Sequence, residues 1–221
     1  MKLVQINCLE GKTIDSRQAE AVLRHRPNFI IFEAPTSLRS PNTPFNSYQP
    51  ENKPLHLVKD HINMLKQVGK KYPWVLSDIR VYENIVKLWK EGHNVQLYNV
   101  DGPSDLLQVP DKQTDRFSPY PPRRGTYLFF WVRVYLREKI MTNHLRPILA
   151  EHSDSDATGL IFLQKFHWIN VQFQSSRPTK AALWKYYFGS FAQLTPKELT
   201  AKIKNHNSTL YKYWTKFSDF S

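Results

Sequence analysis

Four side chains that can bind a cation or activate a water molecule follow predicted strands of this chain. They are the carboxylates Glu10, Glu33 and Asp101 and the imidazole of His167. If the strands are parallel, their carboxyl ends meet at one edge of a sheet, where open α/β sheets bind ligands. Such oxygen and nitrogen groups can hold a divalent cation, or can hold a water molecule and act on it as a general base. A carboxylate at a strand end can equally cap a helix or order a turn. The prediction therefore depends on the fact that all four predicted strands are followed by a side chain of this kind.

Short apolar runs supply the strands that would position these side chains. The strands are expected at residues 2–7, 28–33, 94–100 and 159–163, the last ending near His167. Apolar residues spaced three and four apart predict helices at residues 15–26, 57–72 and 77–91. Residues 126–149 begin with a continuous apolar run that suits either a strand or a buried helix, and we favour one long helix there. The first strand, helix and second strand have the length of a right-handed crossover, so the first two strands should be parallel neighbours that are buried on both faces. The pattern predicts an α/β fold with a mostly parallel central sheet of about four or more strands flanked by helices.

The C-terminal region, from Thr179 on, is expected to be helical. Thr195, Pro196 and Glu198 have the order of an N-cap, a first-turn proline and a capping-box glutamate, which predicts a helix start. Aromatic residues are interleaved with lysine here and recur at helical spacing. They can form the core-facing stripe of a docked helix, which we favour, or a stacking surface for single-stranded nucleic acid. We therefore predict a core domain over residues 1–178 and a helical basic-aromatic extension over residues 179–221 that packs on it.

The chain is strongly basic, with 31 Lys and Arg against 19 Asp and Glu among 221 residues and a net charge of +12. Residues 112–147 hold eight basic and two acidic side chains, and residues 179–221 hold seven and two. Because excess positive charge attracts polyanions, nucleic acid is the first macromolecular partner to consider. It would bind to these two segments.

The sequence also limits the compartment and the function classes. Its single cysteine, Cys8, cannot form an intramolecular disulfide, which favours a reducing, cytoplasmic location. The first twenty residues lack the apolar core of a signal peptide, and no stretch approaches the length of about twenty apolar residues that spans a membrane, so we expect no membrane insertion. Neither GxGxxG nor GxxxxGKS occurs, which argues against dinucleotide and P-loop nucleotide binding.

Two long segments carry an ordered set of motifs. In NCLEGKTIDSRQAEAVLRHRPNFIIFEAP, a strand is followed by a helix and then by a strand that ends in Glu33. In YLREKIMTNHLRPILAEHSDSDATGLIFLQKFHW, a long helix with Arg137 and Met141 precedes a strand and His167. Over residues 2–170 this order resembles the TraB/ChaN/Tiki-like superfamily, which also includes erythromycin-esterase-like proteins. Where that family has two Gly-x-x-His motifs, this chain has Asn7-Cys8-Leu9-Glu10 and Gln164-Lys165-Phe166-His167.

The resemblance implies hydrolysis, because members of the superfamily are thought to include metal-dependent proteases and esterases. It implies catalytic or metal-binding roles for Glu33 and His167. A carboxylate at position 10 would still ligate a hard divalent cation. The expected function is therefore a metal-assisted or acid/base hydrolase. Its cation or water would be held by Glu10, Glu33, Asp101 and His167, and Arg137 would orient an anionic group of the substrate.

Two other functions stay open. The chain can be a non-enzymatic protein that binds nucleic acid or another anionic partner through its basic helices, with a vestigial crevice. It can also be an interaction protein that forms a homodimer through its aromatic tail, Lys180 to Phe220, since a large exposed aromatic face favours a partner.

Overall fold

Two sets of residues each pack among themselves in this computed structural model. The structure describes residues 1–6, 16–33, 55–70, 75–102, 106, 128–153, 156–191 and 193–221. Residues 1–100 and 144–168 form one unit, called here the sheet unit, and residues 101–143 and 169–221 form a second, called here the helical unit. The predicted division into a core domain over residues 1–178 and an extension over residues 179–221 that packs on it stays a prediction.

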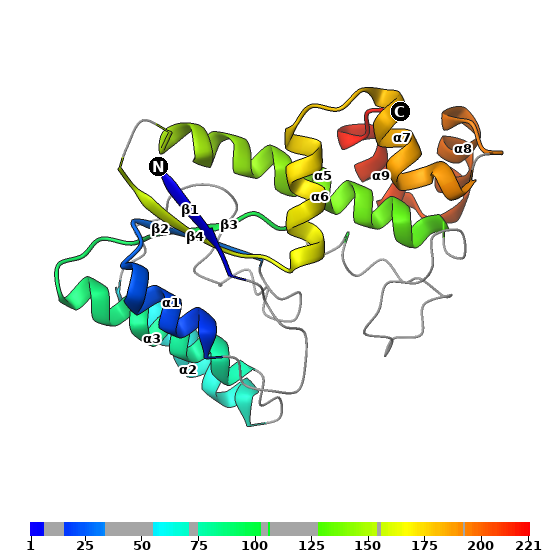
Figure 1. The fold of residues 1–221 in the computed structure, drawn as a ribbon. Helices are drawn as coiled ribbons and strands as arrows, with labels where there is room; N and C mark the ends of the chain where they lie inside the picture. Colours follow the sequence, from blue (N-terminus) through cyan, green and yellow to red (C-terminus); the bar gives the residue numbers. More distant parts are fainter. Residues whose placement is uncertain are drawn as a thin grey trace. The chain divides into compact units, whose positions relative to one another are not determined.

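The sheet unit is built on four parallel strands (Figure 1). They are β1 (Lys2–Gln5), β2 (Phe29–Phe32), β3 (Gln96–Asn99) and β4 (Thr158–Phe162), in the order β1-β4-β2-β3. The predicted α/β fold with a parallel sheet flanked by helices is thus confirmed.

The predicted pairing of the first two strands is wrong. β4 lies between β1 and β2, so β1 pairs with β4 alone among the described strands. The first crossover therefore skips one strand position, which leaves room for β4 when the chain returns to the sheet. Because β1 has a neighbour on only one side, its residues are exposed or half-buried, whereas β2 is buried over Phe29–Ile31. The expectation that both strands are buried on both faces holds for β2 over Phe29–Ile31 and fails for β1.

Three helices pack together on one side of this sheet (Figure 1). They are α1 (Arg17–His25), α2 (Leu55–Gly69) and α3 (Val75–Lys90). Their apolar stripes meet in one core, in which Val22, Leu65 and Ile85 are fully buried. Two of these helices are followed by a residue with positive φ: Arg26 takes a left-handed conformation before Pro27, and Gly92 has φ 78° and donates its N–H to the Trp89 carbonyl at 3.1 Å. A positive φ is the conformation that glycine adopts at little steric cost.

Asp78, in the first turn of α3, gives this helix layer a pH-dependent stability. Burial raises the pKa of its carboxyl from 3.8 to about 6. Above pH 6 the folded chain therefore carries the full cost of a desolvated charge, and below about pH 4 the group is protonated in both folded and unfolded states. We expect Asp78→Asn to be more stable than the parent at pH 7 by up to about 3 kcal/mol, a gain that disappears as the pH falls to 4.

Urea unfolding at four pH values between 4 and 7 measures this difference. Asp60→Asn is the matched control, because Asp60 is an exposed aspartate on the neighbouring helix α2. The free energy of unfolding of this control should differ from that of the parent by the same amount at every pH. The prediction would be contradicted if the difference between Asp78→Asn and the parent were also independent of pH.

The helical unit contains most of the remaining helices. They are α5 (Leu128–Glu151), α6 (Lys165–Ser175), α7 (Lys180–Phe188), a 3-10 turn at Gly189–Phe191, α8 (Pro196–His206) and α9 (Ser208–Phe217). Helices α5 and α6 are each divided between the two units, with residues 144–151 and 165–168 assigned to the sheet unit. The long helix and the helical C-terminal region are confirmed, and α8 begins with the expected capping box of Thr195 and Glu198.

The C-terminal aromatic stripes form the core of the helical unit. Tyr187, Phe188 and Trp214 are buried, and the indole N–H of Trp214 donates to Thr200 Oγ1 at 2.9 Å. Phe220 packs among these rings, with its centroid 6.1 Å from that of Phe188 and 6.2 Å from that of Trp214. The core-packing interpretation is therefore confirmed for these stripes.

Helix α6 was not predicted. The sequence analysis expected the fourth strand to end near His167, whereas β4 ends at Phe162 and His167 lies in the first turn of α6. The buried residues of α6 are His167, Asn170, Val171 and Gln174, a helical stripe that is mostly polar, and its Ile169 is 47% exposed. An apolar periodicity therefore gives no helix signal over this segment.

Candidate active site

Glu33 and His167 lie together in the sheet unit. Glu33 directly follows β2, and His167 lies in the first turn of α6, which starts shortly after β4. The imidazole Nε2 is 3.7 Å from Glu33 Oε1, and the two side chains are only 7% and 9% exposed. This separation is within ion-pair range for a protonated imidazole and is longer than a hydrogen bond. Two of the five predicted site residues are thus brought together at the carboxyl ends of adjacent strands.

The backbone of β4 and the start of α6 fix the Glu33 carboxylate. The Glu33 N–H donates to the Phe162 carbonyl at 3.0 Å, which extends the β2–β4 ladder by one residue. Glu33 Oε2 accepts the N–H of Gln164 at 3.0 Å, just before the first residue of α6. A carboxylate is favoured there by the unpaired N–H groups and the positive end of the helix dipole. One carboxylate oxygen is therefore held by the backbone, and the other is the one nearest His167.

His167 is positioned by a short connection between β4 and α6. The Trp168 N–H donates to the Gln164 carbonyl at 2.9 Å, and the ring of Phe166 meets the imidazole edge-on with centroids 5.4 Å apart. From the edge strand β1, the Gln5 side chain donates to the Leu163 carbonyl at 3.2 Å. The ends of β1, β2 and β4 therefore all contact the connection that presents the histidine.

Asp101 and Arg137, the other two predicted site residues that the structure describes, lie in the helical unit and pair with each other. Arg137 Nε and Nη2 donate to the two carboxylate oxygens of Asp101 at 2.7 and 2.8 Å. The Asp101 side chain is fully buried, and its Oδ1 also accepts the Gly102 N–H at 2.6 Å. The anion held by the Arg137 fork in this structure is thus a carboxylate of the chain itself. A metal-binding role for Asp101 and a substrate-orienting role for Arg137 stay predictions.

The metal centre also stays a prediction. Glu10 lies outside the described residues, and within the described ranges no group of three or more His, Cys, Asp or Glu side chains is arranged to hold a metal ion. Glu33 and His167 offer one oxygen and one nitrogen, a donor pair that suits several divalent cations. Catalytic zinc sites use three protein ligands, so this pair is a partial set.

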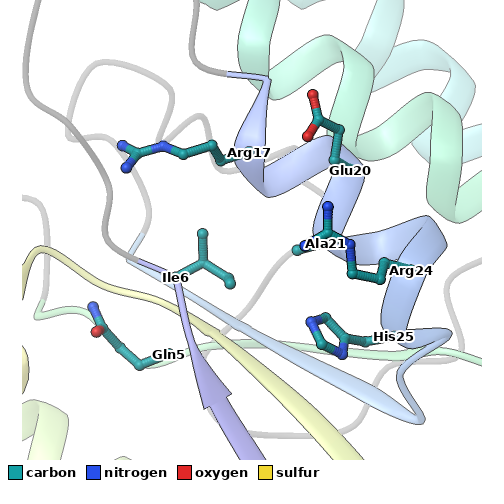
Figure 2. A pocket seen from close by; sticks show the side chains of 7 residues that line it. All are labelled: Gln5, Ile6, Arg17, Glu20, Ala21, Arg24 and His25. Carbon is teal, nitrogen blue, oxygen red and sulfur yellow. The ribbon is translucent and has the colours of Figure 1, made fainter.

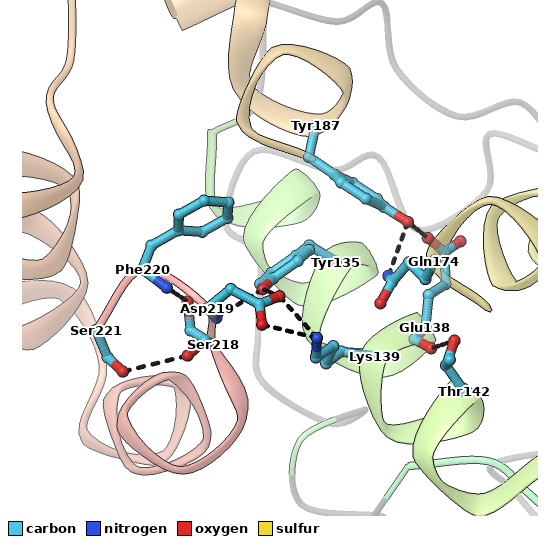
Figure 3. Close-up of polar contacts among 10 residues, drawn as sticks. All are labelled: Tyr135, Glu138, Lys139, Thr142, Gln174, Tyr187, Ser218, Asp219, Phe220 and Ser221. Carbon is cyan, nitrogen blue, oxygen red and sulfur yellow. Dashed lines mark hydrogen bonds and ion pairs between the residues drawn. The ribbon is translucent and has the colours of Figure 1, made fainter. Parts of the chain in front are cut away.

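A buried polar cluster around Glu138 was missed by the sequence analysis. Glu138 is 0% exposed, and its carboxylate accepts the Tyr187 hydroxyl and the Asn170 amide, each at 2.6 Å. The Tyr187 oxygen in turn accepts the Gln174 amide at 2.9 Å (Figure 3). Burial and the nearby carboxylate raise the pKa of Tyr187 well above its ordinary value. The available signal was the position of Glu138 among the buried apolar residues Val134, Met141 and Leu145, at −4, +3 and +7 along α5.

A second polar cluster ties the C-terminal residues to α5 (Figure 3). Asp219 accepts the Tyr135 hydroxyl at 2.9 Å and both of its oxygens lie within 2.8 Å of Lys139 Nζ. The Asp219 N–H donates to the same tyrosine oxygen at 2.9 Å. These bonds satisfy polar groups at the margin of the aromatic core, which is a structural role.

Comparisons with known proteins do not assign a function to this chain, so a proposal depends on the geometry of the site. Within the part of the chain that the structure describes, no helix has the length and apolar character needed to cross a bilayer. The chain matches no known protein-family model, and no curated protein and no solved structure shows significant similarity to it.

Proposed function

We propose that this chain is a hydrolase whose catalytic groups are Glu33 and His167. The observation that carries the proposal is the 3.7 Å approach of two nearly buried side chains, a carboxylate and an imidazole, at the carboxyl ends of the adjacent strands β2 and β4. The resemblance to the TraB/ChaN/Tiki-like superfamily supports the same two positions. The substrate class that this resemblance implies is an ester or an amide.

The pair can carry out acid/base hydrolysis. His167 accepts a proton from a water molecule as the water oxygen attacks the substrate carbonyl carbon, and it then gives that proton to the leaving group as the C–O or C–N bond breaks. The Glu33 carboxylate stabilises the imidazolium formed between these steps, and low solvent exposure strengthens this interaction. Because Gln164 holds the other oxygen of Glu33, the carboxylate is oriented before the substrate arrives.

The same pair suits the metal-assisted version of this reaction. Glu33 Oε1 and His167 Nε2 would be two of the ligands, and Glu10 is a further predicted ligand. A bound divalent cation would supply Lewis acidity and a more acidic water molecule. The bond from the Gln164 N–H to Glu33 Oε2 is of the kind that orients metal-ligating carboxylates.

The test compares Glu33→Gln and His167→Gln with the parent on chromogenic esters and peptide amides, with and without added Zn²⁺ or Mn²⁺. Glutamine at position 33 keeps an oxygen that can accept the Gln164 N–H, so the start of α6 should be preserved. We expect kcat/KM to fall by at least about 100-fold in each variant, the usual contribution of general acid–base catalysis.

Glu91→Gln and His93→Gln are the matched controls, because they make the same changes in the same unit. Glu91 pairs with Arg26 at 2.9 Å, and His93 bonds to the Pro27 carbonyl. Both controls should keep the parent activity. Hydrolysis that survives Glu33→Gln and His167→Gln, or a parent chain that hydrolyses neither substrate type with or without cation, would contradict the proposal.

A second candidate function is the binding of nucleic acid, and one observation favours it. All seven lysines of residues 179–221 are exposed: Lys180, Lys185, Lys197, Lys202, Lys204, Lys212 and Lys216. Only two acidic residues lie in this stretch: the exposed Glu198, which belongs to the capping box, and the half-buried Asp219, which pairs with Lys139. The positive charge of the stretch therefore faces solvent, where it can attract phosphate groups.

Binding of a generic single-stranded oligonucleotide at two salt concentrations tests this candidate. Affinity should fall steeply between about 50 and 200 mM salt if several phosphates are neutralised. A triple Lys202→Gln, Lys204→Gln, Lys212→Gln variant should bind more weakly and lose part of the salt dependence. Absence of binding by the parent chain at the lower salt would reject this function.

The homodimer hypothesis depends on an exposed aromatic face in the tail, Lys180 to Phe220. Leu210, Tyr213 and Trp214 are buried within the helical unit instead. These side chains pack in the core of the chain's own helical unit, and we do not propose a dimer.

A further inference from the structure

A cavity of about 310 Å³ lies in the sheet unit, between α1 and the edge strand β1 (Figure 2). Its lining residues are Gln5, Ile6, Arg17, Glu20, Ala21, Arg24 and His25. None of them belongs to the Glu33–His167 pair. Arginine and histidine contribute three of the seven lining side chains, against one carboxylate. The volume is at the lower end of the range of small-molecule sites.

Two of the basic groups in this cavity have no anionic partner among the residues that the structure describes. Arg24 and His25 make no hydrogen bond or ion pair with any residue in the described ranges. Arg26, which follows them, donates to Glu91 at 2.9 Å. Glu20 precedes Arg24 by four residues, a spacing that permits an ion pair, but its carboxylate points away from Arg24 and His25 in Figure 2. The positive charge in the cavity is therefore left without compensation by these neighbours.

Helix electrostatics explains only part of this arrangement. Basic residues in the last turn of a helix interact favourably with its dipole, which accounts for Arg24 and His25 being basic. It does not account for a cavity beside them. The guanidinium of Arg24 and the imidazole of His25 lie on the side of α1 that faces Ile6 (Figure 2). An apolar wall and two convergent basic groups are the features of a site for an organic anion.

We propose that this cavity binds a small organic phosphate monoester. A phosphate monoester carries close to two negative charges and offers three terminal oxygens, so it matches a guanidinium and an imidazole together better than a singly charged carboxylate does. The phosphate would accept from Arg24 and His25, and the organic group would contact Ile6 and Ala21. The proposal is independent of hydrolysis at Glu33 and His167, because it uses different residues and predicts binding alone.

Titration of the full chain with phenyl phosphate tests the proposal. Binding is measured by calorimetry and by the change in the proton NMR signal of the His25 ring. Benzoate has the same ring with a carboxylate, and inorganic phosphate has the anion without the ring. We expect phenyl phosphate to bind with a saturable shift of the His25 signal, and to bind more tightly than either of the others. Arg24→Gln should weaken binding at least about tenfold, the loss of one charge-assisted hydrogen bond.

Arg26→Gln is the matched control, since it removes an arginine two residues away that already has its anion. This variant should bind phenyl phosphate as the parent does. Equal binding by Arg24→Gln and the parent, or no shift of the His25 signal at millimolar phenyl phosphate, would overturn the proposal. Benzoate binding as tightly as phenyl phosphate would overturn the choice of a phosphate ligand.

Discussion

Replacing Arg137 with methionine is expected to destabilise the chain by about 3–5 kcal/mol. The Asp101 carboxylate is fully buried and has both of its oxygens in the Arg137 fork. Removing the guanidinium leaves a buried negative charge without its counter-charge, a much larger loss than breaking an exposed pair. The free energy of unfolding in urea at pH 7 measures the effect.

Three further variants separate charge from packing at this pair. Arg146→Met, an exposed arginine on the same helix, should cost less than about 1 kcal/mol. Arg137→Lys keeps the charge and loses the two-point geometry, so its cost should be intermediate. The double variant Arg137→Met with Asp101→Asn removes the buried charge and should recover part of the loss. If Arg137→Met costs no more than Arg146→Met, the pair is not the buried fork described above.

The second large effect is expected from Glu138→Met, at about 2–5 kcal/mol. The change leaves the Tyr187 hydroxyl and the Asn170 amide without the acceptors they reach at 2.6 Å. Methionine fills most of the volume, so the cost reflects stranded polar groups more than a cavity. Urea unfolding followed by near-ultraviolet circular dichroism reports both the stability and the packing of the tyrosine.

The matched variants are Glu138→Gln and a double change with Tyr187→Phe. Glu138→Gln retains one acceptor oxygen and should cost less than Glu138→Met. In Glu138→Met with Tyr187→Phe the stranded hydroxyl is gone, so the double variant should lose less than the sum of the two single losses. Strictly additive losses would show that Glu138 and Tyr187 are not coupled.

Strand positions were predictable because continuous apolar runs are unusual outside buried strands. The run before Glu33 and the run before His167 both became central strands. The order of the strands was not predictable, since β1 next to β2 and β1 next to β4 satisfy the same apolar pattern. Helix α6 was missed for a related reason. Its buried face is mostly polar, and the side chains that pair with this face, such as Glu138 and Glu33, come from distant parts of the sequence.

The candidate site was predictable only where the strand-end rule applies. It brought Glu33 and His167 to one edge, although His167 reaches it from the first turn of a helix and not from the end of a strand. Asp101 follows a strand and Arg137 lies in the middle of a long helix. Their spacing along the sequence does not indicate that they form a pair. Glu138 could have been noticed as a charge within an apolar stripe.

The strand order has a consequence for how the chain is made. Strand β4 lies between β1 and β2, with Lys2 opposite Thr158 and Phe29 opposite Gly159. A ribosome therefore releases β1 and β2 long before the strand that joins them exists, and both must wait with unpaired edges. Contacts of such wide sequence separation slow folding, and waiting edges are prone to pair with other chains. Nascent chains of this protein should thus depend on chaperones until β4 emerges, and fragments that stop before it should aggregate.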